Sequence, residues 1–560
     1  MQRTWIFAYP LAALSAVLLA LPFPIARPTP AEHVLAVWPA LVPLLAALLL
    51  RGRITGLRWI ARNLSLGYLC GILWYGGTCY WVYQTMYLYG DMPRPVAAIL
   101  LVLFCLYLGL YFALFALLVT LTHRATGKLG WTLFYTPFLW VAMELACARI
   151  TSFPWNQLGM SQIDNLALSR LATYTGVYGI SFLIVAVNCI LAAAILLRGW
   201  RVRSACLVAG IALAALLQAG TRWHPAAEAA PATAMLLQPN LNVNGNDIWS
   251  SDVFDQNMQH FTALSENRCN PYMEGMPETQ APWHHPDCTA PVSATARSTV
   301  DLIVWPESPA PYRAGDPRFQ HWIAALAQDA HAPMIVGDVA FVRNSVQADQ
   351  PNQLDQINIY NSASFVSPGG AFVGRYDKMH LVPFGEYIPF QNWLWFAHSL
   401  TAQVGTMAHG TQRNIFFTQG HAYGVFICYE SIFAMEVRQY ALLGADVLVN
   451  LSDDGWYGDT SAPWQHLNMA RMRAIENHRW LLRDTNSGVT AAIDPYGRVV
   501  QSLPRHTQST LVAHFNYESD LTFYSVHGDL FAWLCAIIAI VLAVDGCIQH
   551  PQIESESRST

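Results

Sequence analysis

Long apolar stretches fill the first part of the chain and return near its end, with a region of mixed polarity between them. A helix needs roughly 20 apolar residues to cross about 30 Å of hydrocarbon. On that measure the sequence predicts eight membrane-spanning helices, at residues 5–22, 34–50, 66–88, 95–122, 131–148, 168–197, 204–220 and 528–546. We therefore expect spans 1–7 within residues 1–220, span 8 within 521–548 and a polar tail over 549–560.

Residues 221–520 change to short runs rich in β-branched residues, which alternate with stretches of helical periodicity. Strands are predicted at 233–238, 301–307, 332–342, 361–367, 370–377, 422–429, 445–453, 480–494 and 509–515. Apolar residues at three- and four-residue spacing predict helices at 319–330, 431–445 and 466–479. The segment PYGR at 495–498 is typical of a turn between antiparallel strands. The alternation predicts a layered α/β domain with a mixed sheet covered by helices.

Composition and charge place this domain at a membrane. Hydrophobic residues make up 54% of the chain and charged residues 12%, as expected of an integral membrane protein. Short cytoplasmic loops concentrate Lys and Arg. The loops that carry them hold Arg3, then Arg51, Arg53, Arg58 and Arg62, then Arg124 and Lys128, then Arg198, Arg201 and Arg203. We therefore expect both termini and the tail in the cytoplasm and residues 221–520 outside it. The net charge of −5 is too small to indicate nucleic acid as a partner.

Two cysteines of the mixed region flank a polar, proline-rich insertion. An oxidising compartment would let Cys269 and Cys288 close this insertion as a disulfide, and unpaired loop thiols are the alternative. A disulfide there would leave Cys428 as a free thiol.

Three ionisable residues each follow a predicted strand. Cys428 ends the apolar run AYGVFIC just before a predicted helix, Glu307 closes DLIVWPE and Lys378 follows GGAFVGRYD. A thiol before a helix N-terminus is stabilised as thiolate by the helix dipole. Each residue alone has an ordinary explanation, as a packed core thiol, a loop carboxylate and a surface lysine. Their shared position at strand ends favours one common pocket.

The three residue types suit nucleophilic catalysis. A free thiol is mostly protonated at neutral pH, so a neighbouring base such as Glu307 is needed to form the attacking thiolate. Lys378 and a backbone amide at the helix start would stabilise the oxyanion that forms on a carbonyl. No phosphate-binding loop, no serine nucleophile motif and no histidine pair with zinc spacing occurs in the sequence, so we expect no metal.

The segments VWPES, YDKMHLVPFGEYIP and FICYES resemble the Glu, Lys and Cys signatures of the nitrilase (carbon–nitrogen hydrolase) superfamily. With seven predicted spans before this region and one after it, the chain resembles the membrane-embedded branch, the apolipoprotein N-acyltransferases. The resemblance extends to SFPWNQLGMSQ at 152–162, TNSGVTAAIDPYGR at 485–498 and TFYSVHGD at 522–529. It implies an αββα sandwich for the soluble region.

By residue, the resemblance implies Glu307 as general base, Lys378 as oxyanion stabiliser and Cys428 as the acylated nucleophile. It also implies supporting or substrate-binding roles for Glu386, Tyr429, Glu430 and Trp249. The chain departs from the usual pattern at Asp453, where an Asn is common, at Trp480 and Asp484, and in the insertion between Cys269 and Cys288.

The activity that the resemblance implies is transfer of a fatty acyl chain from a phospholipid to an apolipoprotein. The chain would pass through a Cys428 thioester to the α-amino group of an N-terminal diacylglyceryl-cysteine, in a ping-pong cycle without a cofactor. The enzyme would be a monomer in the bacterial inner membrane, with a periplasmic catalytic domain. The apolar segment 393–400 would be either a lid that guides acyl chains or a buried packing segment.

Three other functions compete with this one. A membrane-anchored amidohydrolase would use the same residues on a small amide, but eight spans exceed what an anchor needs. A transporter needs ionisable residues inside its spans, and few are present beyond Glu144 and Asn188. A binding protein with a degenerate site is expected to have lost one of Glu307, Lys378 and Cys428.

Overall fold

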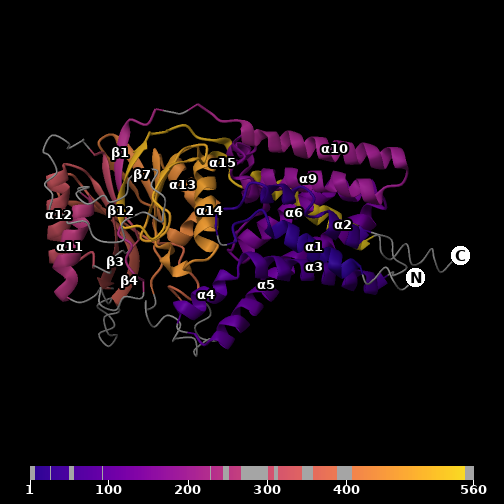
Figure 1. Ribbon diagram of the computed structural model, residues 1–560, viewed down its shortest axis with the longest axis horizontal. Coiled ribbons are helices and arrows are strands. Elements are labelled where there is room, and N and C mark those ends of the chain that lie inside the picture. The colour runs from indigo at the N-terminus through magenta and orange to yellow at the C-terminus, as the bar shows by residue number, and fades with distance from the viewer. Residues whose placement is uncertain are drawn as a thin grey trace, which may run out of the picture.

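The chain forms a helical bundle at one end and an α/β region at the other (Figure 1). The computed structural model describes residues 7–25, 27–49, 56–90, 92–226, 229–243, 251–265, 300–307, 313–343, 357–387 and 407–548. The first 220 residues supply most of the bundle, and α16 (Leu530–Ile548) returns to it after the α/β region.

Long apolar helices build the bundle. Five described helices are long and apolar enough to cross a membrane: α5 (Arg94–Thr126), α6 (Leu129–Ile150), α9 (Val177–Leu196), α10 with its 3-10 extension (Trp200–Arg222) and α16. The shorter or less apolar helices are α1 (Ala8–Ala20), α2 (Val42–Leu49), α3 (Gly56–Thr78) and α4 (Trp81–Leu88). Several apolar helices are therefore present, and the total of eight spans stays a prediction.

Three predicted spans differ from the helices that form. The helix within 66–88 begins earlier, at Gly56, and α3 and α4 are separated at Cys79 and Tyr80. The span at 34–50 is a 3-10 turn, η2 (His33–Val37), followed by α2. The span at 168–197 is divided into α7 (Leu166–Ser169), α8 (Ala172–Thr175) and α9. Gly176 makes the last division with a φ of 62°, and a Cβ there would lie 2.6 Å from the Tyr524 ring.

Polar side chains satisfy the backbone where η2 gives way to α2. Asn188 on α9 accepts from the Leu41 N–H at 2.7 Å and donates to the Val37 carbonyl at 3.0 Å. Ser15 on α1 donates to the Ala40 carbonyl at 2.6 Å. Backbone groups in hydrocarbon must be paired within the protein, so these residues make the break tolerable. Asn188 therefore has a structural role and gives no support to a transport pathway.

The α/β region contains two six-stranded sheets rather than the single sheet that periodicity predicts. The first has the order β12-β1-β2-β3-β4-β5 and the second β11-β10-β9-β8-β7-β6. The first consists of β1 (Ala232–Gln238), β2 (Leu302–Trp305), β3 (Met334–Arg343), β4 (Ile357–Val366), β5 (Phe372–Asp377) and β12 (Ser509–Phe515). The second consists of β6 (Ile415–Thr418), β7 (His421–Ile427), β8 (Val447–Ser452), β9 (Trp480–Thr485), β10 (Ala491–Ile493) and β11 (Val499–Ser502).

The two sheets pack face to face and helices cover their outer faces. Along β2, Leu302 and Val304 belong to the core between the sheets, while Ile303 and Trp305 pack with α11 (Ser251–Ser265) and α12 (Pro317–Ala330). This alternation follows from the two-residue period of a strand. On the second sheet, α13 (Ala434–Leu442) and α14 (Ala462–Asn477) lie between the strands and the bundle (Figure 1).

Each predicted strand segment contains a strand, but the α/β region differs from the sequence prediction in three respects. The segment 480–494 forms two antiparallel strands, β9 and β10. The strand and helix predictions did not include β6, β11 or the helix α11. The predicted helix at 431–445 begins as a 3-10 turn, η9 (Cys428–Ile432), before α13 starts at Ala434. The PYGR turn does join two antiparallel strands, β10 and β11.

Candidate active site

Strand ends bring the three predicted catalytic residues together. Glu307 lies just after β2, Lys378 directly after β5 and Cys428 directly after β7. β2 and β3 are parallel, and two antiparallel pairings from β3 through β4 make β5 run the same way. The carboxyl ends of β2 and β5 therefore lie at the same edge of the first sheet. Cys428 directly follows β7 of the second sheet, and the charges of both Glu307 and Lys378 act on the pKa of its thiol.

Lys378 lies at the centre of a buried polar group, which we call the lysine cluster: Glu307, Asn361, Lys378 and Glu386. The Lys378 Nζ donates to Glu307 Oε1 at 3.0 Å and to Glu386 Oε1 at 2.9 Å, and its side chain is 1% exposed. Asn361 Nδ2 donates to the same two oxygens at 2.7 and 2.8 Å. One ammonium and one amide thus hold both carboxylates.

Backbone amides fix the remaining carboxylate oxygens. Glu307 Oε2 accepts from the Asp453 N–H at 2.9 Å, and Glu386 Oε2 accepts from the Val382 N–H at 2.8 Å. Burial lowers the pKa of Lys378, but Glu307 and Glu386 together outweigh it and hold that pKa well above its ordinary value. Lys378 is therefore a fixed cation in the lysine cluster.

Cys428 occupies a left-handed backbone conformation, with a φ of 49°, and its side chain is buried. Burial raises the pKa of the Cys428 thiol well above its ordinary value, Glu307 raises it further, and Lys378 opposes them. The expected thiolate stabilisation by a helix dipole is wrong, because the short turn η9 separates Cys428 from α13. The thiol therefore needs a base to become a nucleophile.

Glu430 binds backbone groups on both sides of the site. Its Oε1 accepts from the Met379 N–H at 2.8 Å and the His380 N–H at 3.0 Å, and its Oε2 accepts from the Ile427 N–H at 2.7 Å. The Tyr376 hydroxyl donates to the same carboxylate at 2.8 Å. Glu430 thus ties the segment after Lys378 to the turn that carries Cys428.

Tyr429 faces the bundle. Its ring packs against Phe433 with centroids 5.2 Å apart and belongs to the apolar core of the bundle, and its hydroxyl lies 3.4 Å from the Ser152 carbonyl. Trp249, Cys269, Cys288 and the segment 393–400 lie outside the described residues. Their predicted roles remain predictions.

Sequence reasoning missed a second buried group, which we call the histidine cluster: Asp454, His466 and Arg483. Arg483 Nη2 donates to Asp454 Oδ2 at 2.7 Å, and His466 Nδ1 lies 2.9 Å from Asp454 Oδ1. Burial raises the pKa of Asp454, but Arg483 and His466 outweigh burial and lower it below its ordinary value. All three side chains are 0% exposed. The polar residue His466 on the buried face of α14 was the available signal.

Asp453 lies between the two clusters. Its N–H donates to Glu307, and the next residue is Asp454. Its carboxylate accepts from the Gly455 N–H at 3.0 Å and from Asn486 at 3.1 Å. Burial, with a further contribution from Glu307, raises the pKa of Asp453 to about 8.

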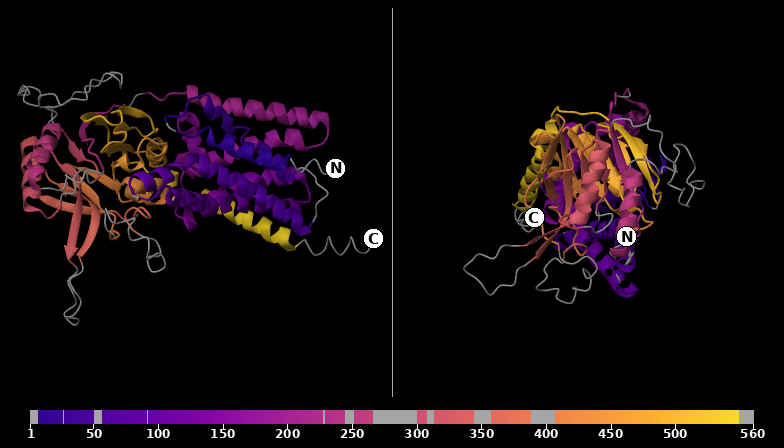
Figure 2. Two further views of the ribbon diagram at one scale, coloured as in Figure 1. Left: turned by 60° about the horizontal axis from the view of Figure 1, so that its bottom comes forward. Right: turned by 90° about the vertical axis from the view of Figure 1, so that its left-hand side faces the viewer.

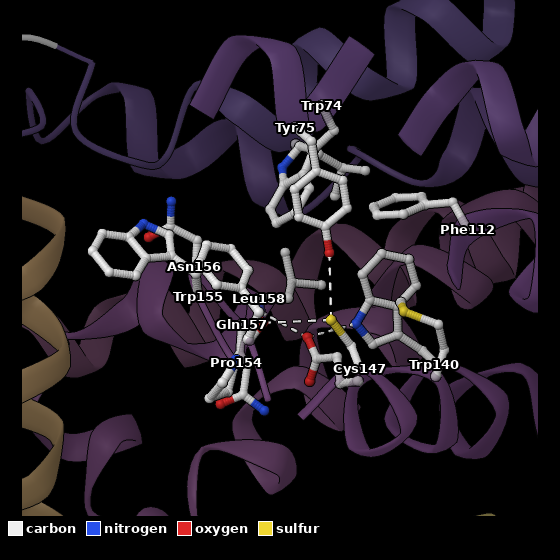
Figure 3. A pocket seen from close by; sticks show the side chains of 14 residues that line it. Trp74, Tyr75, Phe112, Trp140, Cys147, Pro154, Trp155, Asn156, Gln157 and Leu158 are labelled. Atoms are coloured by element: carbon white, nitrogen blue, oxygen red, sulfur yellow. Dashed lines mark hydrogen bonds between the residues drawn. The ribbon is translucent and has the colours of Figure 1, made fainter. Parts of the chain in front are cut away.

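A small cavity lies in the bundle beside the α/β region (Figure 3). Glu144 Oε1 accepts there from the Trp140 indole at 2.9 Å and from the Leu158 N–H at 2.8 Å. The cavity has a volume of about 30 Å³, which is room for water rather than for an acyl chain. Trp155, one of its lining residues, also stacks on His466.

A metal has no evident place at the described site, because Lys378 itself supplies the cation that pairs the two carboxylates. His478, Glu518 and Asp520 form a group of possible ligands elsewhere, but Asp520 also pairs with Arg479. We therefore assign no metal to the described residues.

Comparison with known proteins gives matches to both parts of the chain. The carbon-nitrogen hydrolase family model matches residues 238–519, and the model of the apolipoprotein N-acyltransferase N-terminal domain matches residues 15–190. The apolipoprotein N-acyltransferase of Geobacter metallireducens is 33% identical over 96% of this chain and 94% of its own length. Its counterpart in Ralstonia nicotianae is 31% identical over 96% and 93%, and that in Methylococcus capsulatus is 33% identical over 85% and 86%.

Proposed function

The chain belongs to the apolipoprotein N-acyltransferase family, whose soluble part is a nitrilase-like carbon-nitrogen hydrolase domain, and we propose that it acylates apolipoproteins through a thioester on Cys428. The acyl donor is a membrane phospholipid. The acceptor is the α-amino group of an N-terminal diacylglyceryl-cysteine. The observation that carries this proposal is the buried lysine cluster beside a nucleophile-type turn, in a chain whose apolar helices give access to lipid.

The first half-reaction forms the thioester. Glu307 takes the proton of Cys428, and the sulfur attacks the ester carbonyl of the phospholipid. The Lys378 ammonium and the Tyr429 N–H stabilise the oxyanion. The carbon–oxygen bond then breaks, and Glu307 returns its proton to the leaving oxygen of the lysophospholipid. Burial favours this sequence because it keeps the thiol protonated until a base acts.

The second half-reaction transfers the acyl chain. The neutral amine of the acceptor attacks the thioester carbonyl, Glu307 takes a proton from the nitrogen, and the carbon–sulfur bond breaks. The Cys428 sulfur then regains a proton from Glu307. The donor product leaves before the acceptor binds, so the kinetics are ping-pong. Glu386 shares Lys378 with Glu307 and holds the ammonium in place, while Glu430 and Tyr429 position the turn.

The proposed topology has eight spans in the bacterial inner membrane and a periplasmic domain within residues 221–520. The far end of α16 lies at the bundle end away from the α/β region, which supports placing the termini and the catalytic domain on opposite sides (Figure 2). One chain brings Glu307, Lys378 and Cys428 together, which supports activity as a monomer.

Mass spectrometry of the protein isolated from membranes tests the proposal. We expect an acyl adduct on Cys428 that disappears in Cys428→Ala and is discharged by a diacylated lipopeptide. Cys189→Ser is the matched control, because Cys189 is a buried thiol of α9 in the core of the helical bundle, and the adduct should persist there. An adduct that water removes and the lipopeptide does not would favour an amidohydrolase-type reaction instead. Absence of any adduct in the wild type would refute the thioester.

A further inference from the structure

The backbone at Cys428 is held in a sparsely populated conformation. A φ of 49° is unusual for a residue with a side chain, and such conformations persist only where the surroundings fix them. The Cys428 carbonyl has a definite partner in the structure. It lies 3.0 Å from His466 Nε2, on the first half of α14.

The Cys428 carbonyl requires a proton on Nε2 of His466. A carbonyl oxygen only accepts hydrogen bonds, so Nε2 must be protonated and donate to Cys428. Nδ1 lies 2.9 Å from Asp454 Oδ1 and 3.0 Å from Arg483 Nη2. The ring stacks on Trp155, with centroids 6.1 Å apart and planes at 12°, and meets the Tyr457 ring edge-on. The imidazole is thus held on every side.

Holding the Cys428 carbonyl also sets the direction of the Tyr429 N–H. The two groups belong to one planar trans peptide, in which C=O and N–H point in opposite directions. With the carbonyl directed at His466, the Tyr429 N–H points away from the histidine cluster. This N–H is the backbone donor that the proposed mechanism uses for the oxyanion.

Gln465, the neighbour of His466, connects this turn of α14 to the bundle. Its Oε1 accepts from the Trp155 indole at 2.7 Å. Its Nε2 donates to the Pro24 carbonyl at 2.9 Å and to the Thr78 carbonyl at 3.0 Å. One side chain therefore binds three segments of the bundle, at the end of α1, at the end of α3 and after α6.

We propose that His466 is a positioning residue for the nucleophile, that its Nε2–H orients the Cys428–Tyr429 peptide for acyl transfer, and that Gln465 fixes this arrangement to the helical bundle. The inference rests on the proposed function of Cys428. It predicts that the geometry of the thiol and of its oxyanion donor depends on the packing of the bundle against α14.

Two substitutions of His466 distinguish a hydrogen bond to the Cys428 carbonyl from the mere presence of a side chain at this position. The amide nitrogen of His466→Gln reaches about as far as Nε2 and can donate to Cys428. The amide of His466→Asn reaches only the position of Nδ1. We expect the Asn variant to lose roughly 100-fold in the rate constant of Cys428 acylation, as for a misplaced reacting group. The Gln variant should retain a rate within roughly tenfold of the wild type. The KM for phospholipid should change in neither, because the oxyanion that the Tyr429 N–H contacts forms only in the transition state.

The outcomes are distinguishable. Equal acylation rates in the Asn variant and the wild type, with both folded by thermal unfolding, would overturn the role of His466 and leave the thioester mechanism standing. A wild type that forms no adduct would instead remove the proposed function. Gln465→Met keeps the length of the side chain and removes all three of its hydrogen bonds to the bundle, so an unchanged rate there would overturn the link to the bundle.

A second measurement covers the case in which the Asn variant does not fold. The difference between nitrogen-15 spectra of the histidine-labelled wild type and His466→Gln identifies the His466 ring. A proton on Nε2 supports donation to the Cys428 carbonyl. A ring protonated on Nδ1 alone contradicts it.

Discussion

The two buried clusters on either side of Cys428 differ in their balance of charge. The lysine cluster has two carboxylates, Glu307 and Glu386, for one ammonium. The histidine cluster pairs one carboxylate, Asp454, with the Arg483 guanidinium, and burial followed by Arg483 lowers the pKa of His466. Both clusters are almost fully buried.

This difference in charge balance bears on which cluster can exchange a proton. Burying charges costs free energy unless they are paired, so a balanced cluster is stable as it is and has no reason to exchange a proton. A cluster with one carboxylate in excess can take a proton and thereby become balanced. We infer that the lysine cluster moves the proton and the histidine cluster holds the geometry.

The largest expected effect comes from Glu307→Gln. The amide keeps the size of the side chain and an oxygen for Lys378, but it cannot take the thiol proton. We expect Cys428 acylation to slow by roughly 10²–10⁴-fold, the usual contribution of a general base. Rapid-quench mass spectrometry of the adduct gives the rate.

Glu386→Gln is the matched control for this change. It removes the same charge from the same lysine, whereas Glu307 is the carboxylate whose charge most raises the pKa of the Cys428 thiol. We expect a smaller loss of rate than in Glu307→Gln. Equal losses in the two variants would mean that charge pairing, rather than proton transfer, limits the reaction.

Arg483→Met should act on stability instead. It leaves Asp454 buried without its guanidinium, and breaking a buried pair from one side costs about 3–5 kcal/mol. Chemical unfolding in detergent gives the free energy of unfolding. The double variant Asp454→Asn with Arg483→Met should recover part of the loss, because no charge is then left unpaired. A double variant less stable than the single one would contradict a balanced cluster.

Asp453, which lies between the two clusters, makes the stability of the protein depend on pH. Its pKa of about 8 exceeds the unfolded value of about 3.9, so the folded chain keeps a proton that the unfolded chain releases. Its contribution to stability is therefore present below about pH 4 and is lost as the pH rises to 8. Asp453→Asn should gain stability relative to the wild type across this range, by roughly 1 kcal/mol per pH unit. Parallel unfolding curves against pH would show that Asp453 is ionised in the folded protein.

The smallest effect concerns the thiol itself. Removing the Glu307 charge lowers the pKa of Cys428, so Glu307→Gln should speed alkylation of Cys428 by a small neutral reagent at pH 8. We expect about a tenfold increase for each unit by which the pKa falls. Peptide mass spectrometry follows the modification, and the exposed Cys547 reports the reactivity of the reagent. Slower alkylation would mean that Glu307 does not oppose the thiolate.

The positions of the three candidate residues at strand ends could be predicted from the sequence. Glu307, Lys378 and Cys428 each follow a strand that hydrophobic alternation reveals, so their placement could be read from the chain. Asn361 could not be found in this way. It lies within β4 and reaches the lysine cluster only because β4 pairs with β5, a contact that no local pattern records.

The helical parts show the same limit. Apolar content indicated where apolar helices form, but the interruptions at Cys79 and Tyr80 and between η2 and α2 carry no change in polarity. Asn188 looked like an isolated polar residue of a span, and its partners on the backbone of Val37 and Leu41 become visible only in the folded bundle. The partners of His466 on α14 and of Arg483 on β9 were hidden similarly, because a buried polar residue in a helix or strand gives no local sign of the residue that it contacts.

The helix α10 (Trp200–Gln218) has a consequence for how this chain can change over time. Most of its side chains are turned away from the rest of the protein, and Gly210 is its buried residue, where a Cβ would lie 2.6 Å from Leu191. The apolar residues on the exposed face are constrained by the thickness of the bilayer rather than by contacts with neighbouring residues. Its sequence is therefore free to drift among apolar types and to record the lipid environment of each lineage, while Gly210 keeps the contact with α9.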